Sequence, residues 1–169
     1  MFKKNVNTPS PDGWILLQTI GIAATTLVLA PIVSGCRLLP PLPSVDLKEP
    51  GWSVKQGQGV WRFDKNKPEI AGEILLATKG DRQTYVQFTK GPFPMITGQI
   101  TPRGWQIQRG DTNKRYSAPG KPPSRIVLLQ LPALLAGAPP PAGWIWQHHE
   151  NNWRIENKKT GEFLEGFLE

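Results

Sequence analysis

The sequence predicts a mainly β domain of about nine strands with one short helical segment. The chain is rich in turn-forming residues, with 17 Gly and 18 Pro. Segments such as Trp105-Gln106-Ile107-Gln108 and Trp153-Arg154-Ile155-Glu156 alternate apolar and polar residues, which is the period of a half-buried strand. Within the expected β domain, only residues 124–137 form an apolar segment without that alternation.

Turn residues separate the expected strands. Six strands are expected before the apolar segment, the last of them weak, and three after it: 52–63, 69–79, 83–90, 95–100, 104–109 and 114–117, then 143–149, 152–157 and 161–168. Gly57 and Gly59 lie inside the first strand, where glycines commonly mark a bulge or bend that lets a sheet curl. In the apolar segment, Pro132 suits the first position of a short helix and Gly137 suits its end.

The N-terminal segment has the layout of an export signal. Lys3 and Lys4 precede an apolar stretch, residues 14–33, that contains no charged residue. A stretch of about 20 residues is also long enough to span a bilayer. A plain transmembrane anchor containing one buried cysteine is therefore an alternative.

The stretch closes with Val33-Ser34-Gly35-Cys36, which resembles the lipobox of bacterial lipoproteins. The resemblance implies that residues 1–35 are a signal peptide, that Cys36 carries diacylglycerol and becomes the acylated amino terminus, and that residues 36–50 are a Pro-rich tether for a β domain at 51–169. Arg37 follows, where the sorting rule of enteric bacteria places Asp for inner-membrane retention. The resemblance therefore favours the outer membrane, facing the periplasm, over the inner membrane.

Charge and residue content argue against several function classes. The 20 Lys+Arg and 13 Asp+Glu give a net charge of +7, but no basic run or nucleic-acid motif accompanies it. The only two histidines, His148 and His149, are adjacent and would point to opposite faces of a strand, so we expect no metal site. No nucleophile and base are paired, and no phosphate-binding glycine loop occurs. We expect a protein that is not an enzyme and has no cofactor.

Three short motifs resemble the LolA/LolB lipoprotein-carrier superfamily across residues 51–168. They are Trp52 at the start of the first strand, the Gly91-Pro92-Phe93 turn after the third, and the segment from Leu131 to Pro139. The resemblance implies a curled antiparallel sheet, or unclosed β-barrel, around an apolar cavity beneath a short helical lid. It also implies that an apolar side chain on the loop after the third strand enters the membrane. Phe93 is the candidate, with Met95 behind it.

In that fold the inner face of the sheet would bind acyl chains of lipids or lipoproteins and help localise them to the outer membrane. The candidate cavity-lining residues are Trp61, Ile74, Leu76, Val86, Phe88, Ile96, Ile100, Trp105, Ile107, Trp144 and Trp146. The expected partners are the membrane, acyl chains and a periplasmic carrier protein, and we expect a monomer. The alternative is a non-catalytic structural or interaction lipoprotein of the cell envelope, in which the same residues form a filled core.

Overall fold

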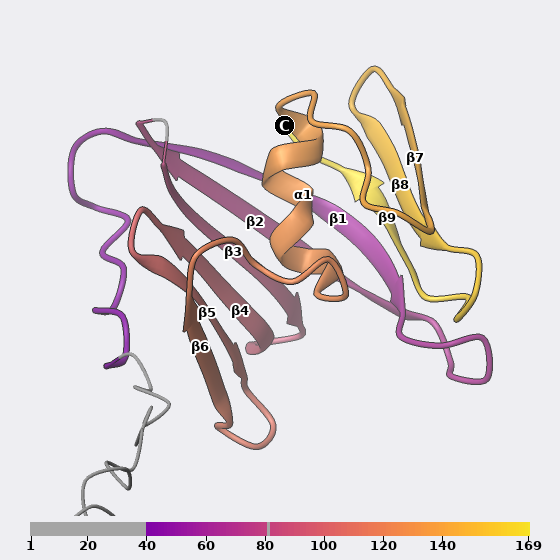
Figure 1. Cartoon of the computed structure of the whole chain (residues 1–169), viewed down its shortest axis with the longest axis horizontal. Helices are drawn as coiled ribbons and strands as arrows, with labels where there is room; N and C mark the ends of the chain where they lie inside the picture. The colour runs from indigo at the N-terminus through magenta and orange to yellow at the C-terminus, as the bar shows by residue number, and fades with distance from the viewer. Residues whose placement is uncertain (1–39, 81) are drawn as a thin grey trace, which may run out of the picture. The chain divides into compact units, whose positions relative to one another are not determined.

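A computed structural model describes residues 40–80 and 82–169, and Figure 1 shows their arrangement. These residues form one antiparallel sheet of nine strands in the spatial order β6-β5-β4-β3-β2-β1-β9-β8-β7. The elements are β1 (Trp52–Arg62), β2 (Ile70–Lys79), β3 (Gln83–Lys90), β4 (Phe93–Thr101), β5 (Gly104–Arg109), β6 (Arg115–Pro119), α1 (Val127–Leu135), β7 (Trp144–His149), β8 (Asn152–Asn157) and β9 (Phe163–Phe167). The expected mainly β fold with one short helix is confirmed.

The sheet curls without closing, because β6 and β7 lie at its two edges. The chain passes from one edge to the other through α1, which lies in front of the central strands in Figure 1. We call the face that packs against α1 the inner face and the opposite one the outer face. The inner face carries most of the buried side chains of the sheet, including Trp61, Ile74 and Val86.

Three glycines form a row across the middle of the sheet. Gly59 of β1 lies opposite both Gly72 of β2 and Gly166 of β9. A Cβ on Gly166 would lie 2.2 Å from the backbone oxygen of Gln58 and 2.9 Å from the Cα of Gly59. No side chain fits between strands that approach so closely, so the curl at this row depends on glycine.

Two sequence expectations need correction. The fourth strand begins at Phe93 rather than at residue 95, because Phe93 pairs with Lys90 across a short turn at Gly91. The helix begins at Val127, which places Pro132 inside it rather than at its first position. Proline removes a helical hydrogen bond there. The burial of Val127 and its neighbours outweighs that loss.

The first described residues lie on the sheet. The backbone N–H of Leu42 donates to Oε1 of Gln106 at 2.9 Å, and Leu42, Val45 and Leu47 are half-buried. Gln106 projects from the outer face of β5 and is itself buried. The segment expected as a free tether therefore docks against the outer face over residues 42–47.

The chain divides into two units, residues 1–36 and Arg37–Glu169, and the second holds the whole sheet with its core. In the part of the chain that the structure describes, α1 is the only helix. Its nine residues are too few to cross a bilayer, which takes about 20.

Candidate functional site

The inner face of the sheet brings together the residues expected to line a cavity. Eight of them are buried in one core cluster: Trp61, Ile74, Leu76, Val86, Phe88, Ile96, Trp105 and Trp144. The other three, Ile100, Ile107 and Trp146, are partly buried and pack against it. The strand register explains the grouping, because inward positions pair across neighbouring strands, as Ile74 does with Phe88 and Phe88 with Ile96.

The space that these residues surround is occupied by α1. Five of its nine residues are buried: Val127, Leu128, Leu129, Leu131 and Leu134. The fit is close, since a Cβ on Gly98 of β4 would lie 2.5 Å from Cδ2 of Leu129. Sequence reasoning identified the segment but did not assign its side chains to the interior. The sequence did contain a signal for this burial, because the segment has no polar face.

Little besides apolar packing holds α1 in place. No side chain caps its first turn, no acidic residue lies in that turn, and no basic residue lies in its last turn. Its one polar side chain, Gln130, donates to the backbone oxygen of Pro123 at 3.0 Å, in the loop before the helix. Within the described residues, no hydrogen bond joins a side chain of α1 to the sheet. The helix therefore has low stability of its own and is held against the sheet by apolar contacts.

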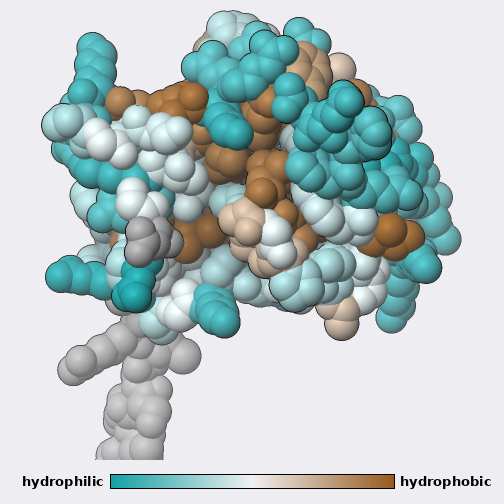
Figure 2. Space-filling model, turned by 90° about the horizontal axis from the view of Figure 1, so that it is seen from above, coloured by the Kyte–Doolittle hydropathy of each residue, from teal (hydrophilic) through white to brown (hydrophobic). Residues whose placement is uncertain are grey.

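A pocket of about 290 Å³ opens beside the last turn of α1, and we call it the lid pocket. Its apolar residues are Leu76, Pro132, Leu135, Ala136 and Leu168, and its polar ones are Ser53, Lys55, Thr78, His148, Glu150 and Asn151. Figure 2 views this end of the molecule, where hydrophobic residues lie at the bottom of a hollow between hydrophilic ones. The pocket connects the apolar interior with solvent.

The β3–β4 hairpin ends in an exposed aromatic residue. Phe93 is 74% exposed, whereas Met95 is half-buried and packs against the core. The β5–β6 loop lies beside this tip, because the backbone N–H of Gly110 donates to the oxygen of Met95. We use "hairpin tip" for residues 90–95 together with that loop, residues 109–115.

Three basic residues belong to the hairpin tip. Lys90 pairs with Phe93 across the turn, Lys114 lies in the β5–β6 loop, and Arg115 begins β6. None of the three takes part in an ion pair within the described residues, whereas Arg109 pairs with Asp111. The tip therefore combines an exposed aromatic ring with uncompensated positive charge.

Cys36, the expected lipid attachment residue, lies outside the described residues. Among residues 40–80 and 82–169, no group of three or more His, Cys, Asp or Glu side chains could hold a metal ion. The ring of His148 stacks on Trp146, with 5.8 Å between ring centroids.

One carboxyl group near the core is strongly perturbed. Burial raises the pKa of Glu162 from its ordinary value of 4.5 to about 7, and the hydrogen bond that it accepts from Trp61 Nε1 at 3.4 Å opposes part of that rise. Glu162 directly precedes β9, next to a tryptophan that is itself buried in the core. Around neutral pH, this group takes up or releases a proton beside the interior.

No protein-family model matches the sequence, and no curated protein matches it.

The Glu162 carboxyl is expected to make folding stability depend on pH. Because its pKa is raised in the folded state, its contribution is complete below about pH 4.5 and is lost as the pH rises towards 7. Thermal melting across this range should show a fall in Tm for the native chain and a smaller fall for Glu162→Gln. Glu73→Gln, at an exposed carboxylate on β2, is the control and should leave the slope unchanged. Equal slopes for the native chain and Glu162→Gln would contradict the assignment.

Proposed function

We propose that this protein is a lipoprotein of the bacterial outer membrane, anchored through Cys36 and facing the periplasm. Its β domain accepts acyl chains of lipids or lipoproteins, delivered by a periplasmic carrier protein, in the space that α1 fills in the free protein. One observation carries the proposal: the concave apolar face is closed by a short, uncapped helix that only apolar contacts hold there. The fold is of the kind that the LolB-like motifs imply.

Exchange of the helix for hydrocarbon is energetically balanced. Burial of one Val or Leu side chain contributes roughly 1.5–3 kcal/mol, so the five buried residues of α1 contribute roughly 8–15 kcal/mol. An acyl chain of about 15 methylenes contributes about 12 kcal/mol at roughly 0.8 kcal/mol for each. Because the two values are similar, an acyl chain can replace the helix without a large change in free energy.

The lid pocket is the entry that this exchange requires. Leu76 and Leu168 supply apolar surface next to the core, and Leu135 belongs to the end of α1 that would move first. Lys55 lies at the rim and takes part in no ion pair within the described residues. Its ammonium group would attract the anionic headgroup of an entering lipid.

A disulfide across the lid tests the exchange. The close approach of Gly98 and Leu129 makes the pair Gly98→Cys and Leu129→Cys suitable for an S–S bond in residues 37–169. We expect the oxidised protein to take up no fluorescent fatty acid and the same sample to take it up after reduction. The reduced form is its own control for the two substitutions.

Amide hydrogen exchange of the native chain gives an independent measurement. Exchange over residues 127–136 should rise when fatty acid is added, because the helix leaves the sheet. Unchanged exchange together with uptake by the oxidised double variant would refute displacement of α1.

The hairpin tip is the part of the domain that we propose to contact the bilayer. An exposed phenylalanine supplies apolar surface, and each basic side chain near an anionic membrane contributes about 1 kcal/mol of attraction. Lys90 lies opposite it, and Lys114 and Arg115 belong to the same tip. The tip would hold the domain against the membrane during transfer of an acyl chain.

Substitution of Phe93 should weaken membrane binding. Burial of one phenylalanine contributes about 1.5–3 kcal/mol, so Phe93→Ser should lower the affinity of residues 37–169 for phosphatidylglycerol vesicles about tenfold to a hundredfold. Vesicle flotation measures the effect. Val54→Ser removes an apolar residue that is 41% exposed on another strand and should bind like the native protein. Equal binding by all three proteins would remove Phe93 from the proposal.

The proposed lipid anchor at Cys36 can be tested separately from acyl-chain binding. In the full chain expressed in bacteria, Cys36→Ala should abolish incorporation of labelled fatty acid, because no other cysteine can be alkylated. The signal segment should also remain uncut. A matched Ser34→Ala variant keeps a small residue in the motif and should be lipidated normally. Unchanged labelling of Cys36→Ala would exclude the lipoprotein assignment.

A second candidate function is favoured by the filled interior. The core cluster runs without interruption from the sheet through α1, as in a lipoprotein whose β domain serves only as a rigid interaction module. Such a protein would bind neither fatty acid nor lipidated peptide in either redox state of the double-cysteine variant. The two functions therefore predict different results in the same experiment.

A further inference from the structure

A large hollow of the described residues lies on the outer face of the sheet, away from α1. It is a groove of about 810 Å³ that crosses β7, β8, β9, β1 and β2, and we call it the outer groove. Five strands at a spacing of about 4.8 Å give it a length of about 19 Å. Its volume is in the range of small-molecule sites, roughly 300–1,000 Å³.

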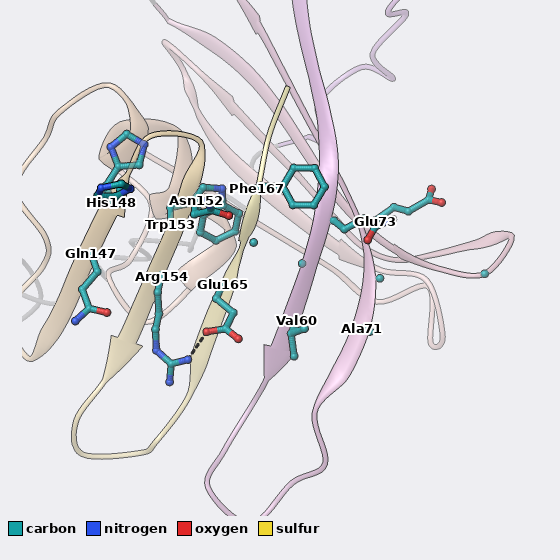
Figure 3. A pocket seen from close by; sticks show the side chains of 16 residues that line it. Val60, Ala71, Glu73, Gln147, His148, Asn152, Trp153, Arg154, Glu165 and Phe167 are labelled. Carbon is teal, nitrogen blue, oxygen red and sulfur yellow. Dashed lines mark hydrogen bonds and ion pairs between the residues drawn. The ribbon is translucent and has the colours of Figure 1, made fainter.

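Two rows of outward side chains form the walls of the outer groove. The strand register aligns Gln147, Arg154, Glu165, Val60 and Ala71 in one row. It aligns His149, Asn152 and Phe167 with the neighbouring pair Gln58 and Glu73 in the other. The glycine row Gly166, Gly59 and Gly72 lies between them. Figure 3 shows the labelled side chains of the groove, which come from the β7–β9 strands on one side and from β1 and β2 on the other.

The walls offer unused hydrogen-bonding groups. No hydrogen bond within the described residues occupies the side chains of five of these residues: Gln58, Glu73, Gln147, His149 and Asn152. Three of the five carry amides, each of which presents both a donor and an acceptor. A ligand rich in groups that also donate and accept, such as hydroxyls, matches this set.

The charges disfavour an anionic ligand. One arginine and two glutamates line the groove, which gives a net charge of −1 in a chain whose overall charge is +7. Arg154 already donates to both Glu156 and Glu165, and its guanidinium lies 4.2 Å from the ring centroid of Phe163. A phosphate or carboxylate would meet Glu73 without a free cation to bind.

The groove also differs from a site for hydrocarbon or for an added strand. Its five unpaired polar side chains would lose hydrogen bonds to water against an acyl chain. The backbones of β8, β9, β1 and β2 are paired on both sides, so they have no free edge for an extended peptide. Phe167 gives one apolar platform in the middle of its row, and in Figure 3 its ring extends from β9 towards β1.

We infer that the outer groove binds a neutral oligosaccharide of several pyranose rings. The amides of Gln58, Gln147 and Asn152 exchange hydrogen bonds with sugar hydroxyls, and the ring of Phe167 packs against the apolar face of one sugar. This site is separate from the acyl-binding interior of the proposed function. An envelope protein with both would contact lipid on one side of its sheet and glycan on the other.

Calorimetric titration of residues 37–169 tests the inference with three tetrasaccharides. Chitotetraose and cellotetraose are neutral, with and without acetamido groups, and tetragalacturonate is anionic. We expect saturable binding of at least one neutral sugar and none of the anionic one. Binding of chitotetraose alone would identify an N-acetylated glycan as the ligand source. Binding of both chitotetraose and cellotetraose would show that the groove recognises sugar hydroxyls in general.

Paired variants locate the binding. Gln58→Ala with Asn152→Ala should weaken it about tenfold or more, because two hydrogen-bonding side chains are lost. Gln83→Ala with Gln99→Ala removes two amides from strands outside the groove and should leave binding unchanged. The inference is overturned if no neutral sugar binds up to about 10 mM, if tetragalacturonate binds more tightly, or if both variant pairs behave alike. None of these results bears on fatty-acid uptake, so the two proposals fail separately.

Discussion

The apolar contact between α1 and the concave face of the sheet is the interaction on which the rest of the domain depends. A sheet that curls without closing leaves one face of aromatic and aliphatic side chains to be covered, and here nine residues provide that cover. Because the helix has neither capping side chains nor polar bonds to the sheet, its position is set by the hydrophobic effect alone. Another apolar molecule of similar size would compete with α1 for the concave face of the sheet.

The two faces of the sheet have separate chemistry. Inward positions next to α1 are mostly apolar, and glycines take the places where strands or the helix come too close for a side chain. Outward positions along the same strands carry amides, acids and basic groups. A period of two residues therefore lets one set of strands present an apolar surface on one side and a polar surface on the other.

Much of this fold follows from local sequence patterns. The alternation at Trp105–Gln108 and the turn residues between strands predicted the elements nearly as they occur, since turn chemistry and burial of one face are local constraints. The start of α1 was missed because the preference of proline for a first turn is weaker than the burial of Val127 through Leu131. The outer groove could not be predicted, because its walls combine residues from β1, β2 and the last three strands, which only the register brings together.

The docking of Leu42 on Gln106 limits how a lipid-anchored form can move. Pro40 lies four positions after residue 36, and an extended chain of that length spans about 14 Å. The domain of such a form would stay close to the bilayer surface. It would have few orientations available and could not diffuse into the surrounding compartment. Encounters with membrane-bound molecules would then take place in two dimensions at high effective concentration, whereas a soluble partner would have to come to the surface.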